Sequence, residues 1–170
     1  MKKIRLFKPS IGIDELNKIK SVFKKSWLGY GPLVKNFEER FAKFIGCKYA
    51  VAVNSGTAAL HLSILSYNFK KGKKVLVPAI TFSATAASVL YSKLEPKFVD
   101  VNPNDLTLDF EDLKRKYSKD RVALICVHMG GHPCEMEKIL PWAKKKKLLV
   151  IEDCAETCGA IYKGRKLGTW

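Results

Sequence analysis

Short apolar runs alternate with amphipathic segments along this chain, and glycine or proline marks most of the junctions between them. The apolar runs are nearly uniform, which is typical of strands that are buried on both faces of a parallel sheet. The amphipathic segments repeat their apolar residues with the period of a helix, as helices that cover a sheet do. The alternation therefore predicts an α/β fold built on a parallel sheet.

This pattern predicts five strands and six helices. The strands are expected at residues 49–53, 75–77, 97–101, 122–127 and 148–152. Two amphipathic helices precede them, with apolar stripes at Leu16, Ile19, Val22 and Phe23 and at Phe37, Phe41, Phe44 and Ile45, the second ending at Gly46. The other helices are expected at residues 57–67, 82–91, 110–116 and 135–146. Asp109 is an expected N-cap, and Pro141 should kink the last helix or start it afresh.

Composition favours one compact domain, which we divide into a helical segment at residues 1–46 and an α/β core at residues 47–170. The length and the 47% hydrophobic content suit a single core. No apolar run is long enough to cross a bilayer, and no apolar signal core follows the basic start, so we expect a cytoplasmic protein. No closing helix is expected after the fifth strand, and the chain is therefore expected to be incomplete at its end.

The net charge of +15 would attract phosphates, anionic membranes or nucleic acid. Most of the excess is lysine that is dispersed through helices and turns, and the one dense run is Lys144 to Lys147 at the end of an expected helix. Lysines there favour the negative end of the helix dipole. Because aromatic residues are not interleaved with the basic ones as single-strand binding requires, we interpret the charge as solvated surface. No membrane partner is expected, and nucleic acid is the less favoured alternative.

The five cysteines give no reason to expect a disulfide framework or a metal site. None forms a CxxC pair. Cys154 and Cys158 lie four residues apart, which on a helix would place two ligands on one face, but no second pair or well-spaced histidine accompanies them. His128 and His132 are interpreted as structural residues of the turn after the fourth strand. Free thiols and no bound metal are therefore expected.

Residues 51–60 predict a strand that turns directly into a helix through Asn54-Ser55-Gly56-Thr57. Such a turn presents free backbone N–H groups and the positive end of the helix dipole, and both suit a phosphate. Gly56 lets a ligand approach the backbone closely, and the neighbouring hydroxyls can add hydrogen bonds. The alternative is an ordinary serine N-cap with no ligand.

Two carboxylates, Glu152 and Asp153, emerge at the carboxyl end of the last expected strand. Ligands of open α/β sheets bind at that edge. A carboxylate there is costly unless it meets a cation, a metal or hydrogen-bond donors. Asp153 can pair with a protonated ring nitrogen, because a nearby anion raises the pKa of such a nitrogen. The alternative is a solvated strand end.

These patterns together resemble the DegT/DnrJ/EryC1/StrS family of sugar aminotransferases that depend on pyridoxal 5'-phosphate (PLP). The matching pieces follow the family order over nearly the whole chain, at residues 29–32 with 37–38, 54–60, 77–85, 98–101, 127–133, 151–155 and 159–164. The resemblance implies a three-layer α/β fold, the large domain of an aspartate aminotransferase-like (fold type I) transferase. This domain is incomplete here, because the chain is expected to lack the last strands of the sheet.

The resemblance also implies the residues that bind the cofactor. The PLP phosphate would lie against Gly56, Thr57 and Ala58, the ring would stack on Phe82, and Asp153 would hold the pyridinium nitrogen. Glu156 stands where many members place glutamine or histidine near the ring hydroxyl.

No catalytic residue is assigned, because the family's covalent lysine belongs to a Ser-Phe-Lys motif that this chain does not reach. Lys163 and Lys166 match an exposed turn of the family instead. The chain is therefore expected to be inactive alone and to bind PLP at best weakly and without a covalent bond.

For the intact protein, the resemblance implies transfer of an amino group from glutamate or glutamine to a nucleotide-linked keto-sugar, within a homodimer. The product would enter the synthesis of a polysaccharide or an antibiotic. An inactive remnant or non-catalytic partner with the same fold, and a basic nucleic-acid-binding module, are the alternatives. Because the strand at 49–53 would lack ladder partners, we expect the isolated chain to be unstable or to need the carboxyl-terminal portion as a separate polypeptide.

Overall fold

A computed structural model gives the structure of residues 8–170. Residues 1–7, which form most of the basic start of the chain, lie outside the described residues. The central sheet has four parallel strands in the order β2-β1-β3-β4. They are β1 (Lys74–Pro78), β2 (Glu95–Val99), β3 (Arg121–Val127) and β4 (Leu149–Asp153). The strand order reverses between β1 and β3, and ligand crevices of open α/β sheets lie at the carboxyl ends of strands beside such a reversal.

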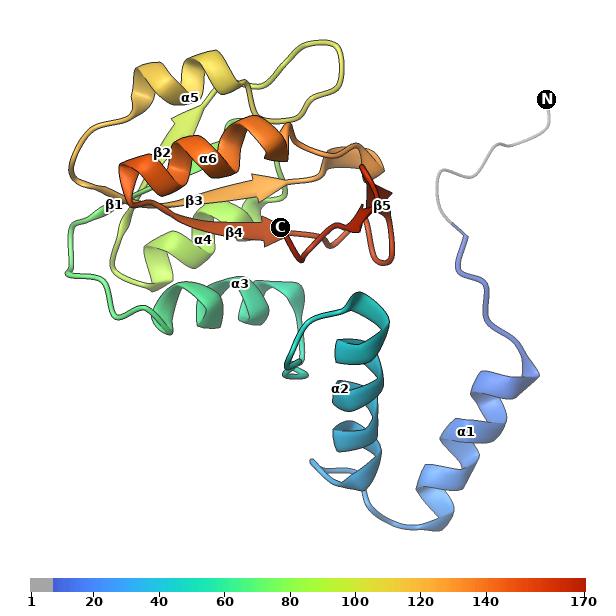
Figure 1. Cartoon of the computed structure of the whole chain (residues 1–170). Helices are drawn as coiled ribbons and strands as arrows, with labels where there is room; N and C mark the ends of the chain where they lie inside the picture. The colour runs from blue at the N-terminus through green and yellow to red at the C-terminus, as the bar shows by residue number, and fades with distance from the viewer. Residues whose placement is uncertain (1–7) are drawn as a thin grey trace, which may run out of the picture.

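Helices cover both faces of this sheet (Figure 1). On one face lie α3 (Gly56–Leu65) and α4 (Ser83–Tyr91), and on the other lie α5 (Phe110–Lys116) and α6 (Met136–Lys146). Alternate residues of each strand point to opposite faces, so Val75 and Val77 pack with the first pair of helices, whereas Leu76 packs with the second. Burial on both faces explains the uniform apolarity of the two central strands, β1 and β3. The three-layer α/β fold predicted from the sequence is confirmed.

Two further helices, α1 (Ile13–Lys24) and α2 (Pro32–Ile45), precede the sheet and extend away from it (Figure 1). Pro32 occupies the first turn of α2, where its missing N–H costs nothing, and Gly46 ends that helix in the left-handed conformation at φ +93°. Both predicted helices are therefore present. Their apolar stripes stay largely exposed: α1 has no buried residue, and α2 buries only Ala42.

The start of α5 has the N-cap that the sequence predicts. The Asp109 carboxylate accepts hydrogen bonds from the backbone N–H groups of Glu111, at 2.7 Å, and Asp112, at 2.9 Å. These two amides have no partner within the first turn of the helix, so the cap satisfies them. Leu113 is fully buried one turn further on, which makes this short helix part of the core.

Substituting Asp109→Ala is expected to lower the free energy of unfolding by about 1 kcal/mol, the usual cost of losing an N-cap. Urea denaturation followed by tryptophan fluorescence measures the change. Asp14→Ala is the control, because Asp14 is an exposed residue of α1 that caps no helix. Equal losses for the two variants would contradict the capping role.

Three details differ from the sequence prediction. Residues 49–53 form no strand, because no described strand lies alongside to pair with them, and Tyr49 and Val51 are more than 70% exposed. The strand expected at 97–101 begins and ends two residues earlier, at Glu95 and Val99. The last helix neither breaks nor restarts at Pro141: α6 runs through this residue to Lys146.

After β4 the chain makes turns and then a small antiparallel hairpin of β5 (Ile161–Tyr162) and β6 (Arg165–Lys166). A single-turn 3₁₀ helix, η1 (Met129–Gly131), follows β3. Among residues 8–170, no helix has the length and apolarity that crossing a membrane requires. Two segments with candidate binding residues lie at the same edge: residues 54–57 lead into α3, and residues 152–156 end β4 and form the turn after it.

Candidate functional site at the carboxyl edge of the sheet

The first turn of α3 and the last residue of β4 lie at the same end of the sheet (Figure 1). They also share one face of it. Leu149 and Ile151 of β4 pack against the cluster formed with α3 and α4, whereas Val150 packs against the opposite cluster. Because side chains alternate along a strand, Asp153 belongs to the face of Leu149 and Ile151. The structure thus brings the corner at 55–58 and the Asp153 carboxylate to one edge and one face.

The first turn of α3 offers free amides. Ser55 is its N-cap, and its hydroxyl accepts the amide of Ala58 at 3.1 Å, while the Ala59 amide donates to the Ser55 carbonyl. Within residues 8–170 the amides of Gly56 and Thr57 donate to no other group. Free amides at a helix start bind an anion well, since the helix dipole adds to the hydrogen bonds.

Neither packing within the described chain nor backbone conformation requires glycine at position 56. A Cβ built on it would meet no heavy atom of the described chain within 4 Å, and its φ is not in the left-handed region. The space in front of the residue is therefore open. A glycine at such a position is useful when a ligand has to come close to the backbone.

Phe82 supplies an aromatic surface at the same edge. It is the residue immediately before α4, in the turn that follows β1, and its side chain is 76% exposed. Exposed phenylalanine rings are unfavourable in water unless something covers them, because each buries a large apolar area when covered. The exposed ring fits a planar aromatic ligand that stacks on it.

Asp153 keeps part of its carboxylate free. One oxygen, Oδ1, accepts the amide of Ala155 at 3.1 Å, and this bond fixes the turn after β4. The other oxygen, Oδ2, accepts no hydrogen bond from the described residues. The carboxylate is half-buried, so a cation or a charged N–H would interact with it more strongly than in water.

Glu156 binds the protein itself. Its carboxylate accepts the backbone amide of Gly130 at 2.6 Å, and so joins the turn after β4 to the η1 turn after β3. The side chain is exposed. Its geometry is that of a link between two turns at the carboxyl edge, a role that the sequence did not indicate.

A buried cluster next to Asp153 was also not found from the sequence. The Glu152 carboxylate accepts the amides of Gly168 and Trp170, both at 2.8 Å, and lies 3.2 Å from His128 Nε2. The His128 side chain is fully buried, and that of Glu152 is 9% exposed. Glu152 thereby ties the end of the chain to the sheet, and the two strand-end carboxylates have different surroundings.

The hydrogen bonds of this cluster determine its charges. His128 Nδ1 accepts the amide of Cys134 at 3.1 Å, so Nε2 carries the proton that the ring donates to Glu152. Burial raises the pKa of Glu152, but hydrogen bonds from His128, Gly168 and Trp170 outweigh it and lower the pKa below the ordinary value of 4.5. Glu152 is therefore an ionised structural acceptor. His128 has the structural role expected from the sequence.

The same cluster contains the described chain's group of candidate metal ligands, His128, Glu152 and Cys154, whose ligand atoms lie within 4.8 Å of one another. Both nitrogens of His128 are already used in hydrogen bonds, and both oxygens of Glu152 accept amides. A metal would have to displace these bonds. The segment from Cys154 to Cys158 forms turns, so the idea of two thiols on one helical face is wrong.

Comparison with known proteins identifies the family to which the chain belongs. The DegT/DnrJ/EryC1/StrS aminotransferase family matches residues 9–170. GDP-perosamine synthase of Escherichia coli O157:H7 is 36% identical over 171 aligned positions, which cover 100% of this chain and 47% of that protein. The chain spans less than half the length of this protein and of the other curated relatives that it matches.

Solved structures give the same answer for the fold. An aminotransferase from Psychrobacter cryohalolentis superposes with a TM-score of 0.91 at 34% identity, covering 94% of this chain and 41% of that one. Escherichia coli GDP-4-keto-6-deoxy-D-mannose-3-dehydratase with bound hydrated PLP superposes with a TM-score of 0.93 at 31% identity, covering 100% of this chain and 45% of that one. The fold is that of the PLP-dependent aminotransferases.

Proposed function

We propose, because the chain belongs to the DegT/DnrJ/EryC1/StrS aminotransferase family, that it is the amino-terminal part of a PLP-dependent enzyme that aminates a nucleotide-linked keto-sugar. The names of relatives support this assignment, since they include GDP-perosamine synthases and a dTDP-sugar 4-aminotransferase. One observation on this chain supports the proposal most directly. The free amides at the start of α3 and the Asp153 carboxylate, which has one oxygen without a described partner, lie at one edge and on one face of the sheet.

In this proposal the residues at the carboxyl edge hold PLP as follows. The amides of Gly56 and Thr57, with the first turn through Ala58, bind the phosphate dianion. The Phe82 ring covers one face of the pyridine ring, and Asp153 Oδ2 accepts the ring N–H and keeps that nitrogen protonated. The cofactor, when bound, supplies an electron sink for chemistry at the substrate carbon.

Glu156 is proposed to act near the cofactor through the backbone. Its bond to the Gly130 amide holds the turns after β3 and β4 together, beside the strand end that carries Asp153. A fixed turn keeps the Asp153 carboxylate at the geometry that a hydrogen bond to the ring nitrogen needs. Direct contact of Glu156 with the ring hydroxyl would require this bond to break.

Neither lysine after Asp153 is proposed to bind PLP covalently. Lys163 forms an ion pair with Glu137, and the Lys166 ammonium hydrogen-bonds to the Phe44 carbonyl. Lys163 lies in the turn of the β5–β6 hairpin and Lys166 lies in β6, where the family resemblance places an exposed turn. Retention of PLP by this chain therefore rests on the non-covalent contacts above.

The finer parts of the assignment are also proposals. Glutamate or glutamine is the amino donor, the whole protein is a cytoplasmic homodimer, and its product is an amino sugar for a polysaccharide or an antibiotic. The exposed apolar stripes of α1 and α2 support an assembly that covers them, because exposed apolar area of this extent is unfavourable in water.

Substituting Asp153→Asn is expected to weaken PLP retention by about 10- to 100-fold, because a charge-assisted hydrogen bond is worth about 1.5–3 kcal/mol. Equilibrium dialysis of the 170-residue chain against PLP measures the retained cofactor. The absorbance spectrum of the bound fraction should also shift toward the unprotonated ring. Asp14→Asn is the matched control, since Asp14 lies in the first turn of α1.

Two results would count against this assignment. If Asp153→Asn and Asp14→Asn retained equal amounts of PLP, the carboxylate at the end of β4 would have no role in holding the ring. If a complete polypeptide containing this segment formed no amino sugar from GDP- or dTDP-linked keto-sugars with either donor, the aminotransferase proposal would fail even with PLP bound.

A further inference from the structure

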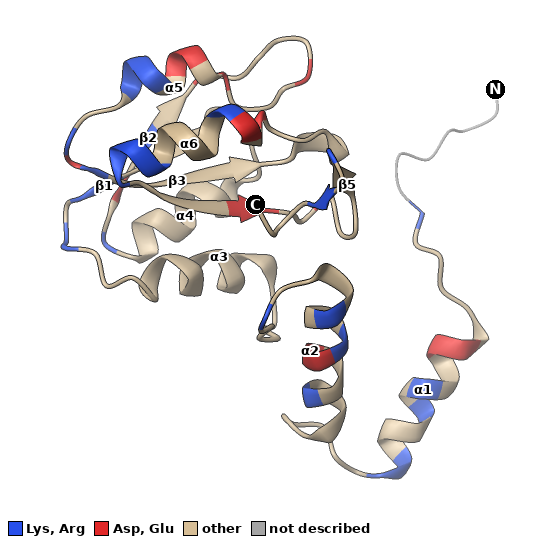
Figure 2. Cartoon of the chain, in the orientation of Figure 1, with Lys and Arg blue, Asp and Glu red and all other residues tan. Residues whose placement is uncertain are grey.

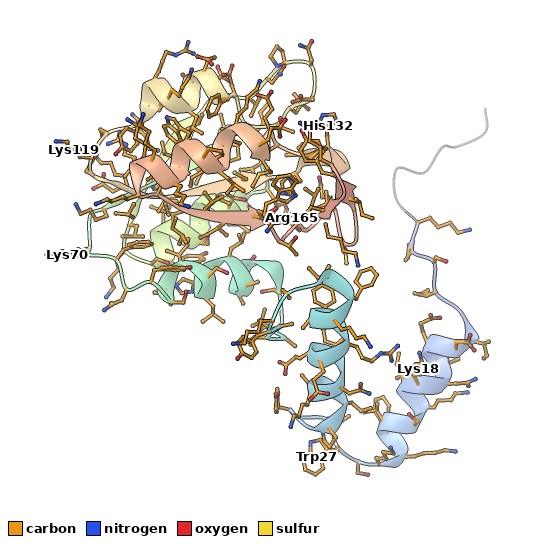
Figure 3. All side chains as sticks on the ribbon, viewed as in Figure 1. Lys18, Trp27, Lys70, Lys119, His132 and Arg165 are labelled. Carbon is orange, nitrogen blue, oxygen red and sulfur yellow. The ribbon has the colours of Figure 1, made fainter. Side chains whose placement is uncertain are left out.

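The net positive charge of the chain is concentrated at the amino edge of the sheet, opposite the candidate site. Lysines that are dispersed in the sequence gather there in space, on the four segments 70–74, 93–95, 116–121 and 144–147, which we call the basic edge. These segments contain twelve Lys or Arg and two acidic residues, a net charge of +10 out of the +15 of the whole chain. Figure 2 shows the blue segments at this end, and Figure 3 labels Lys70 and Lys119 there, at the opposite end from His132 and Arg165.

Topology explains this concentration. In a parallel sheet every connection from a helix to the next strand returns to the amino edge, so the four basic segments meet there although they are far apart in sequence. Lysines also favour helix carboxyl ends, and the run at 144–147 ends α6. A charge distributed along the sequence therefore becomes a one-sided field in the folded chain.

Little of this charge is neutralised within residues 8–170. The two acidic residues of the basic edge, Glu95 and Asp120, form ion pairs with Lys74 and Arg121. The remaining ten lysines of the basic edge pair with no described carboxylate: Lys70, Lys71, Lys73, Lys93, Lys116, Lys119, Lys144, Lys145, Lys146 and Lys147. Nearly all of them are exposed.

The aromatic residues on and beside the basic edge are not arranged to stack on nucleobases. The Tyr67 ring is stacked on Phe69, with centroids 5.8 Å apart and planes at 9°. The Tyr117 ring lies against Trp142 and beneath the Lys146 ammonium, which is 5.0 Å from its centroid. A single-strand binding surface needs free aromatic faces. The planar guanidinium of arginine favours bidentate readout of guanine in a duplex, whereas the one arginine of the basic edge is ion-paired.

Lysines with partly exposed tyrosines are instead typical of proteins that lie against lipid head groups. A cavity of about 200 Å³ opens within the basic edge, lined among others by Lys71, Lys93, Asn68 and Ser92. Its other lining residues are apolar, Ile64, Leu65, Phe69 and Leu94, so the cavity adds a small apolar recess beside two lysines of the basic edge.

We propose, in place of the sequence-based expectation of a solvated surface with no membrane partner, that the basic edge docks the protein onto an anionic bilayer surface, bound by the phosphates of acidic lipids. The candidate cofactor site lies at the opposite end of the sheet and so faces away from the bilayer in this orientation (Figure 1). Docking of this kind is peripheral: it needs no inserted helix and weakens as salt screens the charges. It does not depend on the binding of PLP.

The test is sedimentation of the 170-residue chain with vesicles of phosphatidylcholine alone or with phosphatidylglycerol at about one third of the lipid. The edge variant carries Lys144→Gln, Lys145→Gln, Lys146→Gln and Lys147→Gln. The control variant carries Lys18→Gln, Lys20→Gln, Lys24→Gln and Lys25→Gln, which removes the same charge from α1 and the turn after it. Circular dichroism checks that both variants keep the secondary structure of the parent.

We expect the parent chain and the control variant to sediment with the anionic vesicles and not with neutral ones. The edge variant should bind at least about tenfold more weakly, and added salt should release all of them. Equal losses for the two variants would overturn the proposal, because net charge alone would then explain binding. Retention on duplex or single-stranded RNA without binding to vesicles would overturn it in favour of nucleic acid.

Discussion

Substituting Gly56→Ala is expected to weaken PLP retention by at least about tenfold while leaving the fold as stable as before or up to about 1 kcal/mol more stable. The added methyl group meets no atom of the described chain within 4 Å, so it costs nothing internally, and alanine is the better helix former. In the proposed binding mode, the same methyl group would project into the space through which the phosphate reaches the free amides. Loss of binding without loss of stability is the signature of a ligand contact.

Equilibrium dialysis against PLP and urea denaturation together measure this result. Gly29→Ala is the matched control, since a Cβ at Gly29 also meets nothing within 4 Å and the residue lies before α2, away from the carboxyl edge of the sheet. Gly56→Asp should remove binding entirely, because a carboxylate would then occupy the anion site. PLP retention that is unchanged in both Gly56 variants would show that the start of α3 holds no phosphate.

The second large effect is expected at Glu152, where Glu152→Gln should lower the free energy of unfolding by about 2–4 kcal/mol. The carboxylate accepts the amides of Gly168 and Trp170 on different oxygens, and an amide group can accept on only one. The amide of Gly168 or that of the half-buried Trp170 therefore loses its partner, and the buried pairing with His128 weakens. Urea denaturation of the parent chain and the variant gives the difference.

The loss should depend on pH in a defined direction. The folded-state pKa of Glu152 lies below its ordinary value of 4.5, so the stabilisation is complete above about that pH and disappears as pH falls through the folded-state pKa. The gap in stability between parent and Glu152→Gln should thus be constant at neutral pH and close in acid. Glu39→Gln, on the exposed side of α2, should show no gap at any pH. A gap that persists unchanged below pH 3 would mean that charge on Glu152 is not its cause.

The fold was largely predictable because uniform apolar strands and periodic helices produce strong local patterns. The two central, buried strands β1 and β3 and the half-buried edge strand β4 were found within a residue or two. Residues 49–53 have the same apolar composition but form no strand, since strand formation requires a neighbour that local sequence cannot reveal. The persistence of α6 through Pro141 depends likewise on its packing: Ile139 and Ala143, on either side of the proline, are buried in the core.

The candidate site was predictable in part. Gly56, Phe82 and Asp153 lie where the motif order implied, at one edge of the sheet, and their roles in binding PLP stay predictions. The partners of Glu152 and Glu156 could not be predicted, because both carboxylates bind backbone amides of residues far away in sequence, and an amide carries no residue-specific signal. The strand-end carboxylates were treated as one motif although they belong to opposite faces.

The side chains of Glu152 and Asp153 point to opposite faces of the sheet, so the register between β4 and β3 decides which carboxylate reaches which face. Cys126 pairs with Glu152 and Val127 with Asp153. A shift by one residue, from an insertion or deletion within β4, would turn each side chain to the other face. The free carboxylate would then enter the His128 cluster, and the anchoring one would point toward the start of α3. Natural variation in length should therefore avoid this strand and accumulate in the turns beyond it.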